Sequence, residues 1–428
     1  RIKDPNVNFI SNIQLDLRDK SPKVNAVGDL LSANLKQLNI ANNNIQLTGL
    51  LDINFEGNNI DNFIGYAKFF NGKLKGEAAV VNFDSLTLHS NITNGIKEIH
   101  LGGGTPTFFS PENLERLING IFSRADKAAE HEFSFEGHPN NTTREHLQTL
   151  YDLGFRRVSF GVQDYSNTVQ TAIHRIQPFN NVAKVTFWAR EIGYSSIGHD
   201  LVFGLPFQTL DDVIDTIDKT KSLLPDRLAF YSYAHVPWIK GNGQRGFNDE
   251  DLPQDNIKRE LYEEGKKRLA THHYHEIGMD HFALTSDSMF EAFQKGTLHR
   301  NFMGYTVTKT KVMIGLGVSS ISDSWSSFAQ NEKNIEDYYN RLKMNEIPIY
   351  RGHILTDEDL VIRRHILNLM CTFETQWEDD ASYFKEIPNV IEHLQEMEHD
   401  GLLEFHLNGL QITEKGKPYV RNICMAFD

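Results

Sequence analysis

The spacing of apolar residues changes near residue 95, and this change constrains the fold more than any other feature of the chain. Before it, apolar and polar residues alternate in short runs, as in "LLDINFEGNNIDNF" and "VNFDSLTLHSNIT". Alternation with period two turns one face of a strand toward a core, and Asn-Asn or Asn-Gly pairs between the runs are typical of turns. The residues from Asn8 to Thr93 are therefore predicted to form an all-β meander or layered sheet.

After residue 95, short apolar runs alternate with stretches of helical periodicity. The runs are "IKEIHL", "HEFSFE", "RRVSFGV", "SSIGHDLVFGLP", "DRLAFYSYAHVP" and "HEIGMDHFAL". Connections of this length allow right-handed crossovers, so this part is predicted to form a parallel α/β sheet or partial barrel. Helix starts are expected at Ser110-Pro111 and at two capping boxes, Thr142 with Glu145 and Thr209 with Asp212.

Composition excludes several classes of protein. The 428 residues carry a formal net charge of -14 and contain no block of about five Lys or Arg, which argues against nucleic-acid binding. No apolar run reaches about 18 residues, and the first residues, "RIKDPNVNF", lack the apolar core of a signal peptide, so neither a membrane span nor export is expected. The only cysteines, Cys371 and Cys424, are too few for a disulfide framework, which predicts a reducing, cytoplasmic location.

Polar residues and glycines follow each predicted strand of the α/β part. In parallel sheets and barrels such positions gather at the carboxyl edge, where ligands bind. Glycine lets backbone N–H groups approach a ligand, and carboxylates or amides bind hydroxyl or amino groups. Any one position alone could be a turn or a cap, but the series predicts a site for a small polar ligand. Its members are Gly102–Thr105, Glu136, Gly161–Asp164, Asp200, Gly204–Pro206 and Tyr233–His235.

Two further motifs are weaker. "GNGQRG", Gly241–Gly246, has the spacing of a dinucleotide-binding loop, but it follows no clear strand and opens no helix. "HHYHEIGMDH" is rich in histidine, but Met279 stands where a zinc-binding H-E-x-x-H motif needs its second histidine. Neither a dinucleotide site nor a metal site is expected at these positions.

From about Ile96 to Asp428 the sequence closely resembles the oxygen-independent coproporphyrinogen III oxidases, radical S-adenosylmethionine (SAM) enzymes of bacterial heme biosynthesis. The resemblance rests on "HLGGGTPT", "FGVQDY", "AREIGY", "DLVFGLPFQT", "DRLAFYSYAHVP", "IGMDHFA", "LHRNFMGYT", "GVSSIS" and "RNICMAFD". It implies the oxidative decarboxylation of two propionates of coproporphyrinogen III to vinyl groups, giving protoporphyrinogen IX through a 5′-deoxyadenosyl radical. It also implies a [4Fe–4S] cluster that binds one SAM, a second SAM nearby, an electron donor and a monomeric chain.

The resemblance also implies a domain organisation. A β-rich segment, residues 1–95, precedes a partial triosephosphate-isomerase-like radical SAM barrel, residues 96–325, which lacks its first strand. A mostly helical, winged-helix-like domain, residues 326–428, follows and is expected to cover the barrel mouth rather than to bind DNA, because it has no basic stripe. The β-rich segment resembles segments of envelope proteins of the translocation and assembly module type. This resemblance rests on the repetitive β-rich pattern and on no catalytic motif, and a β-rich scaffold of unknown role is the alternative.

The resemblance assigns site residues position by position. Gly103 and Glu136 correspond to contacts of the cluster-bound SAM, and His281 and Arg300 are assigned to the propionates of the substrate. The family motif Glu-x-Asp-Pro reads Glu-Gly-His-Pro from Glu136 onward, which keeps the glutamate but changes its neighbours. Contacts to the second SAM are assigned to Gly104, Thr105, Gln163, Arg175, Asp200, Ala234 and Ile321.

The cysteines that hold the cluster in this family are missing. A Cys-x3-Cys-x2-Cys loop supplies three thiolates there, roughly forty to fifty residues before the glycine triplet. Here that region reads "LLDINFEGNNIDNF", and Cys371 and Cys424 are too far apart to form the loop and are expected to be buried thiols. We therefore predict that this chain binds no [4Fe–4S] cluster in the manner of the family and does not turn over.

Three interpretations stay open. The chain is an oxidase whose N-terminal part, with the cysteine loop, has been replaced by foreign sequence; or a non-catalytic protein that binds SAM or a tetrapyrrole and carries the β segment as an interaction module; or a misassembled chimera of two unrelated genes. The change of character falls between the first and second expected barrel strands, which favours an artificial junction. It also predicts an exposed sheet edge at "IKEIHL".

Overall fold

A computed structural model of the chain describes residues 2–3, 7–16, 23–34, 36, 44–59, 62–76, 80–91, 95–238, 246–310, 312–377 and 384–427. The chain forms two compact units, Arg1–Ile96 with Ile121–His131, and Lys97–Gly120 with Glu132–Asp428, and each is described by itself. Within the described residues, no helix is both long and apolar enough to cross a membrane.

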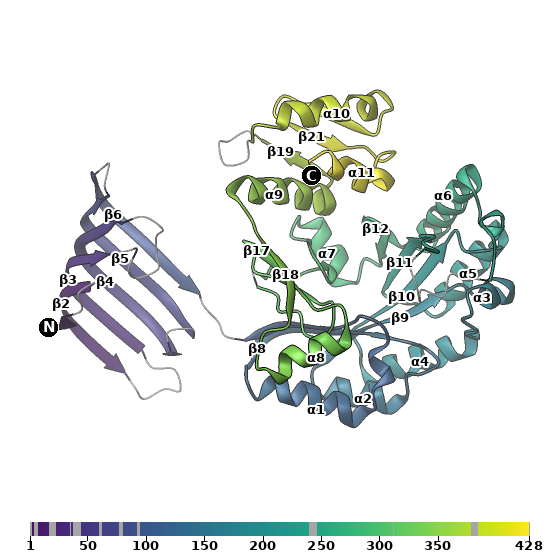
Figure 1. The fold of residues 1–428 in the computed structure, drawn as a ribbon, viewed down its shortest axis with the longest axis horizontal. Coiled ribbons are helices and arrows are strands. Elements are labelled where there is room, and N and C mark those ends of the chain that lie inside the picture. Colours follow the sequence, from purple (N-terminus) through teal and green to yellow (C-terminus); the bar gives the residue numbers. More distant parts are fainter. Residues whose placement is uncertain are drawn as a thin grey trace. The chain divides into compact units, whose positions relative to one another are not determined.

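The N-terminal part folds as a 6-stranded antiparallel meander, as the period-two alternation predicts. Its strands are hydrogen-bonded in sequence order, and Leu30, Leu47, Leu51 and Phe69 pack as a small apolar core. Figure 1 shows these strands side by side. They are β1 (Ile2–Lys3), β2 (Val7–Asp16), β3 (Lys23–Asn34), β4 (Gln46–Asn59), β5 (Asn62–Lys75) and β6 (Val80–Asn91).

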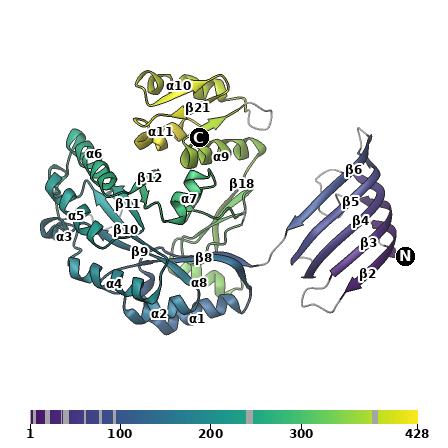
Figure 2. The ribbon, with the colours of Figure 1, turned by 180° about the vertical axis from the view of Figure 1, so that it is seen from behind.

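The α/β part contains a 7-stranded sheet in the order β12-β13-β11-β10-β9-β8-β7. Strands β8 to β11 are parallel, and the sheet curls into a half barrel that Figures 1 and 2 show from opposite sides. Strand β7 ends the sheet, which confirms the predicted edge at "IKEIHL" for the described strands. The bounds are β7 (Ile96–Leu101), β8 (Lys127–Gly137), β9 (Phe155–Gln163), β10 (Ser196–Phe203), β11 (Arg227–Ser232), β12 (His275–Gly278) and β13 (His281–Ala283).

The prediction of one parallel strand over "HEIGMDHFAL" is wrong. The segment forms a hairpin in which β12 and β13 are antiparallel, and β13 is also antiparallel to β11. The chain turns at Asp280, whose φ is 58°, and the hydroxyl of Tyr305 accepts a hydrogen bond from the backbone N–H of Met279 at 3.0 Å. A contact from a distant part of the chain thus fixes a turn that lies inside an otherwise strand-like run.

Helices follow the parallel strands and cover the convex face of the sheet, as Figures 1 and 2 show for α1, α2 and α4. The apolar residues between the two layers include Val162, Val182, Leu201, Ile217 and Phe230. The bounds are α1 (Pro111–Phe122), α2 (Arg144–Asp152), α3 (Asn167–Ala172), α4 (Phe179–Ile192), α5 (Leu210–Ser222) and α6 (Asp255–Thr271). Because side chains alternate along a strand, the residues between these core positions point to the concave face.

One of the two predicted capping boxes is confirmed. Thr209 and Asp212 cap α5 reciprocally, but the box predicted for Thr142 and Glu145 is wrong, because Thr143 and His146 form it instead. The hydroxyl of Thr142 is buried, lies 3.0 Å from that of Thr107 and donates to the carbonyl of His138. It is therefore not free to cap the helix.

The rest of the chain is built from short helices and small sheets. A 3-stranded sheet, β19-β21-β20, packs with α9, α10 and α11, as expected for helices followed by a hairpin. The turn between β20 and β21 is Leu407-Asn408, because Gly409 already pairs with His406. The elements are α7 (Ser288–Gln294), β14 (His299–Asn301), β15 (Gly304–Thr306), β16 (Ile321–Asp323), β17 (Ser327–Asn331), α8 (Ile335–Lys343), β18 (Ile349–Ile354), α9 (Asp357–Thr372), β19 (Glu374–Gln376), α10 (Ile387–His399), β20 (Leu403–His406), β21 (Gly409–Ile412) and α11 (Val420–Met425).

Candidate functional site

A cavity of about 250 Å³ lies on the concave side of the half barrel. Side chains from the sheet form one wall, and residues from β14, β15 and α11 complete it. Its ionisable and hydroxyl-bearing lining residues include Glu98, His100, Glu132, Ser134, Glu136, Arg157, Ser159, Asp200, Arg227, Tyr231, Asp280, His281, Arg300, Tyr305, Thr306 and Arg421. A concave site with converging polar groups is the usual form of a small-molecule site.

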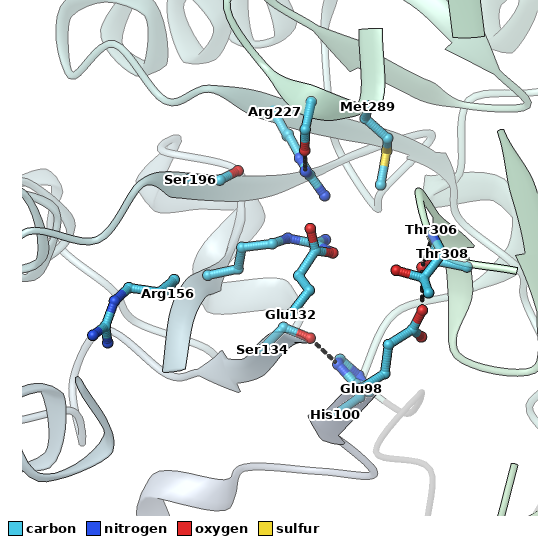
Figure 3. Close-up of polar contacts among 12 residues, drawn as sticks. Glu98, His100, Glu132, Ser134, Arg156, Ser196, Arg227, Met289, Thr306 and Thr308 are labelled. Atoms are coloured by element: carbon cyan, nitrogen blue, oxygen red, sulfur yellow. Dashed lines mark hydrogen bonds and ion pairs between the residues drawn. The ribbon is translucent and has the colours of Figure 1, made fainter. Parts of the chain in front are cut away.

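One part of the cavity wall is a layer of paired charges. The guanidinium of Arg157 forms an ion pair with Glu132, and Nε of Arg227 donates to both carboxylate oxygens of Asp287 at 2.8 Å. Burial raises the pKa of Glu98, which accepts a hydrogen bond from the hydroxyl of Thr306 at 2.9 Å. Figure 3 shows Glu98, Glu132 and Arg227 pointing into this interior. Because these charged groups already have partners inside the protein, their role is to hold the side chains of the cavity wall in place.

A second part gathers two carboxylates from the strands on either side of β9, Glu136 on β8 and Asp200 on β10. Asp200 accepts a hydrogen bond from the hydroxyl of Ser159 at 2.9 Å, and Nε2 of His100 lies 3.4 Å from Oε1 of Glu136. Burial raises the pKa of Asp200 to about 6, and the charge of Glu136 adds to this effect, whereas Arg175 and His100 oppose it. Two acceptors so placed can bind the hydroxyl or amino groups of a ligand.

The glycine triplet forms the loop after β7. Gly103 and Gly104 have φ values of 75° and 121°, which favour glycine, and a Cβ at either position would meet no atom within 4 Å. The backbone there is therefore open to a ligand rather than packed against the protein. Thr105 follows as the N-cap residue of the 3-10 helix η1 (Pro106–Phe108).

Gln163 and Arg175 converge at the end of β9. Nη2 of Arg175 donates to the carbonyl of Gly161 at 2.7 Å, and Gln163 has a φ of 69°. A Cβ at Gly161 would lie 2.8 Å from Nη2 of Arg175 and 3.2 Å from Nε2 of Gln163. Nε of Arg175 is buried without a hydrogen-bond partner among the described residues. Backbone strain and an unpartnered buried donor are both typical of ligand sites.

The structure thus brings together several of the predicted SAM contacts and leaves others apart. Glu136 and Asp200 share the cavity, and Arg175 interacts electrostatically with Asp200. Ala234 follows β11, and Ile321 lies on β16 in a separate sheet. The cavity lining includes neither of them, nor the other predicted SAM contacts Gly103, Gly104, Thr105, Gln163 and Arg175. The "GNGQRG" motif falls on residues 241–246, of which only Gly246 is described.

The predicted substrate contacts, His281 and Arg300, both line the cavity. Burial lowers the pKa of His281 to about 4, and its Nδ1 lies 2.7 Å from the carbonyl oxygen of Met279. A carbonyl can only accept, so Nδ1 carries the proton and Nε2 accepts from the hydroxyl of Tyr231 at 3.3 Å. The guanidinium of Arg300 lies 4.6 Å from the centroid of the Tyr305 ring.

Most residues of the cavity are absent from the sequence-based site predictions, among them His100, Tyr231, Tyr305 and Arg421. Alternation along "IKEIHL" puts His100 on the same strand face as Glu98, so strand periodicity could have identified it. Arg421 comes from the far end of the chain, and no local signal connects it to the sheet.

The described residues do not fit a [4Fe–4S] cluster. The sequence contains two cysteines, Cys371 and Cys424, and both are free and buried, as predicted. Burial raises the pKa of each thiol to about 12, which disfavours the thiolate that binds iron. No group of three or more His, Cys, Asp or Glu suited to a metal ion is found in the part of the chain that the structure describes. SAM fits better, because the open glycine backbone, Asp200 and the unpartnered Nε of Arg175 offer groups for its ribose and carboxylate.

The chain is similar to known proteins of one enzyme family. The Radical SAM superfamily model matches residues 88–220. The chain is 40% identical to the oxygen-independent coproporphyrinogen III oxidase of Helicobacter pylori strain 26695 and 37% identical to that of Escherichia coli K12, in each case over 78% of this chain and 74% of the relative. The solved structure of coproporphyrinogen III oxidase (HemN) from Escherichia coli, a radical SAM enzyme, superposes with a TM-score of 0.75 at 35% identity over 78% of each chain. The chain therefore belongs to the oxygen-independent coproporphyrinogen III oxidase family of radical SAM proteins.

Proposed function

We propose that residues 97–427 form the SAM- and substrate-binding part of an oxygen-independent coproporphyrinogen III oxidase, and that coproporphyrinogen III occupies the cavity. The observation that carries this proposal is Nε of Arg175, which is buried beside Asp200 without a partner among the described residues. Leaving such a donor unpaired costs about 1–3 kcal/mol or more, a cost that a ligand carboxylate would remove. The methionine part of SAM carries such a carboxylate.

Each residue then has a defined binding role. Asp200 accepts hydrogen bonds from the ribose hydroxyls, Arg175 pairs with the carboxylate, and the backbone at Gly103 and Gly104 approaches the methionine amino group. Farther along the same sheet, on β13 and β11, the neutral His281 and the hydroxyl of Tyr231 orient the tetrapyrrole. In this family SAM and an iron–sulfur cluster supply the radical chemistry, while the protein binds, orients and excludes water.

The same residues account for binding without turnover. Since the chain offers two buried thiols and no cysteine loop, we expect it to hold SAM and substrate but to form no vinyl product. This matches the second open interpretation, a non-catalytic binding protein, as far as residues 97–427 are concerned.

The test is calorimetric titration of the full chain with SAM. We expect saturable binding that Arg175→Gln weakens about tenfold, because a charge-assisted hydrogen bond is lost. Arg351→Gln is the matched control, since this exposed arginine donates to Gln330 on a separate sheet and should leave the affinity unchanged. The proposal is wrong if the wild-type chain does not bind SAM, or if Arg175→Gln folds normally and binds SAM as tightly as the wild type.

A further inference from the structure

The arginines that line the cavity fall into two groups: Arg157 and Arg227 in one, Arg300 and Arg421 in the other. Arg157 is paired with Glu132. Arg227 is paired with Asp287, and its Nη2 also donates to the hydroxyl of Ser288 at 3.1 Å. These two positive charges are neutralised by carboxylates of the same wall. Arg300 and Arg421 have no such ion pair among the described residues.

Arg300 is held in place but not neutralised. Its guanidinium lies over the ring of Tyr305, whose hydroxyl donates to the carbonyl of Met370 at 2.8 Å and accepts from the N–H of Met279. Because the hydroxyl both donates and accepts a hydrogen bond, the Tyr305 ring is held in one position. The ring in turn orients the guanidinium of Arg300 that lies over it. Nη1 of Arg300 is buried and has no hydrogen-bond partner in the described part of the chain. A planar, oriented guanidinium with a free N–H edge is suited to a carboxylate.

Arg421 reaches the same cavity from the other end of the chain. It is the second residue of the short helix α11, which Val420, Ile423 and Cys424 anchor in the C-terminal core. Asp280 also lines the cavity, and burial raises its pKa to about 6 while the charges of Arg421 and Arg300 lower it. Two guanidinium groups thus act on one carboxyl group of the cavity lining.

We propose that Arg300 and Arg421 together bind a propionate carboxylate of the tetrapyrrole substrate. This inference rests on the proposed function, because it takes coproporphyrinogen III as the occupant. The pair joins the β14–β15 hairpin to α11 through the bound carboxylate, so the C-terminal helix contributes directly to substrate selection. Each arginine supplies a fork of N–H donors, and a propionate supplies a carboxylate acceptor for them, including for the buried Nη1 of Arg300.

The experiment measures binding of coproporphyrin III, the stable oxidised form of the substrate, to the full chain by fluorescence quenching. Arg421→Gln and Arg300→Gln should each raise the dissociation constant about tenfold. Together they should raise it by less than the product of the single effects, because one carboxylate is shared. Arg421→Lys should restore much of the affinity, and Arg351→Gln should have no effect. SAM affinity and the thermal midpoint should stay at wild-type values in Arg421→Gln, which separates binding from folding.

The tetramethyl ester of coproporphyrin III provides the second arm. It should bind the wild type more weakly than the free acid does, and Arg421→Gln should not weaken it further. Equal losses for acid and ester, or undiminished binding of the acid to both glutamine variants, would overturn the inference and leave the proposed function intact. A wild-type chain that binds SAM but not coproporphyrin III would overturn both.

Discussion

Replacement of Asp200 by Asn should stabilise the protein at neutral pH while weakening SAM binding. Burial and the charge of Glu136 raise the pKa of Asp200 from 3.8 to about 6. The native state therefore holds this proton more tightly than the unfolded chain, and stability falls as the pH rises from about 4 to about 6. Asn keeps an oxygen that accepts from Ser159 but removes the charge.

The magnitude follows from the two pKa values. The pKa of Asp200 differs by about 2 between the two states, and each pKa unit corresponds to about 1.36 kcal/mol. Asp200→Asn should therefore raise the free energy of unfolding by about 3 kcal/mol at pH 8. At pH 4.5 the carboxyl is almost fully protonated in the native state and partly protonated in the unfolded state. The expected gain in the free energy of unfolding for Asp200→Asn is then about 1 kcal/mol.

The assay is scanning calorimetry of the wild type and the variant at pH 4.5 and pH 8. We expect the midpoint of the variant to exceed that of the wild type by several degrees at pH 8 and by about a third as much at pH 4.5. Asp215→Asn is the control, because its exposed carboxylate forms only an i,i+4 ion pair with Lys219 at 2.6 Å and should change stability by under about 1 kcal/mol. A variant that is less stable than the wild type at pH 8, or equally stabilised at both pH values, would refute the reasoning.

Two other substitutions test the walls of the site. Gly104→Ala should cost about 1–3 kcal/mol, because φ is 121° there although a Cβ would meet no atom within 4 Å; thermal unfolding checks this, and an unchanged midpoint would contradict it. Arg227→Gln should cost about 3–5 kcal/mol, because it leaves Asp287 buried without its ion pair. Chemical denaturation measures this loss, and a loss under about 1 kcal/mol would show that the ion pair does not hold the wall together.

Much of the fold follows from periodicity and from turn residues. Alternation with Asn-rich breaks identified the antiparallel meander, and the later alternation of strands and helices identified the half barrel. Thr209 and Asp212 cap their helix because both lie in an exposed local motif. Such features depend on neighbours in sequence, so the sequence alone is enough to predict them.

The errors arise where distant residues decide the local structure. Thr142 is drawn into a buried hydroxyl contact with Thr107, so the cap moves to the next residue. Tyr305 holds the turn at Met279 that splits a continuous apolar run into two antiparallel strands. Arg421 meets the cavity only because the C-terminal helix packs beside it. Contacts between residues so far apart leave no periodic signal in the sequence.

The central claim is that this chain has the binding site of its family without the ligands for the cluster. It is tested most directly by anaerobic reconstitution with iron and sulfide, followed by measurement of bound iron, acid-labile sulfide and vinyl product from coproporphyrinogen III. The account predicts iron and sulfide at the background level of a Cys371→Ala/Cys424→Ala variant treated in parallel, and no vinyl product. A stoichiometric [4Fe–4S] cluster, or formation of the vinyl product by the wild-type chain, would contradict it.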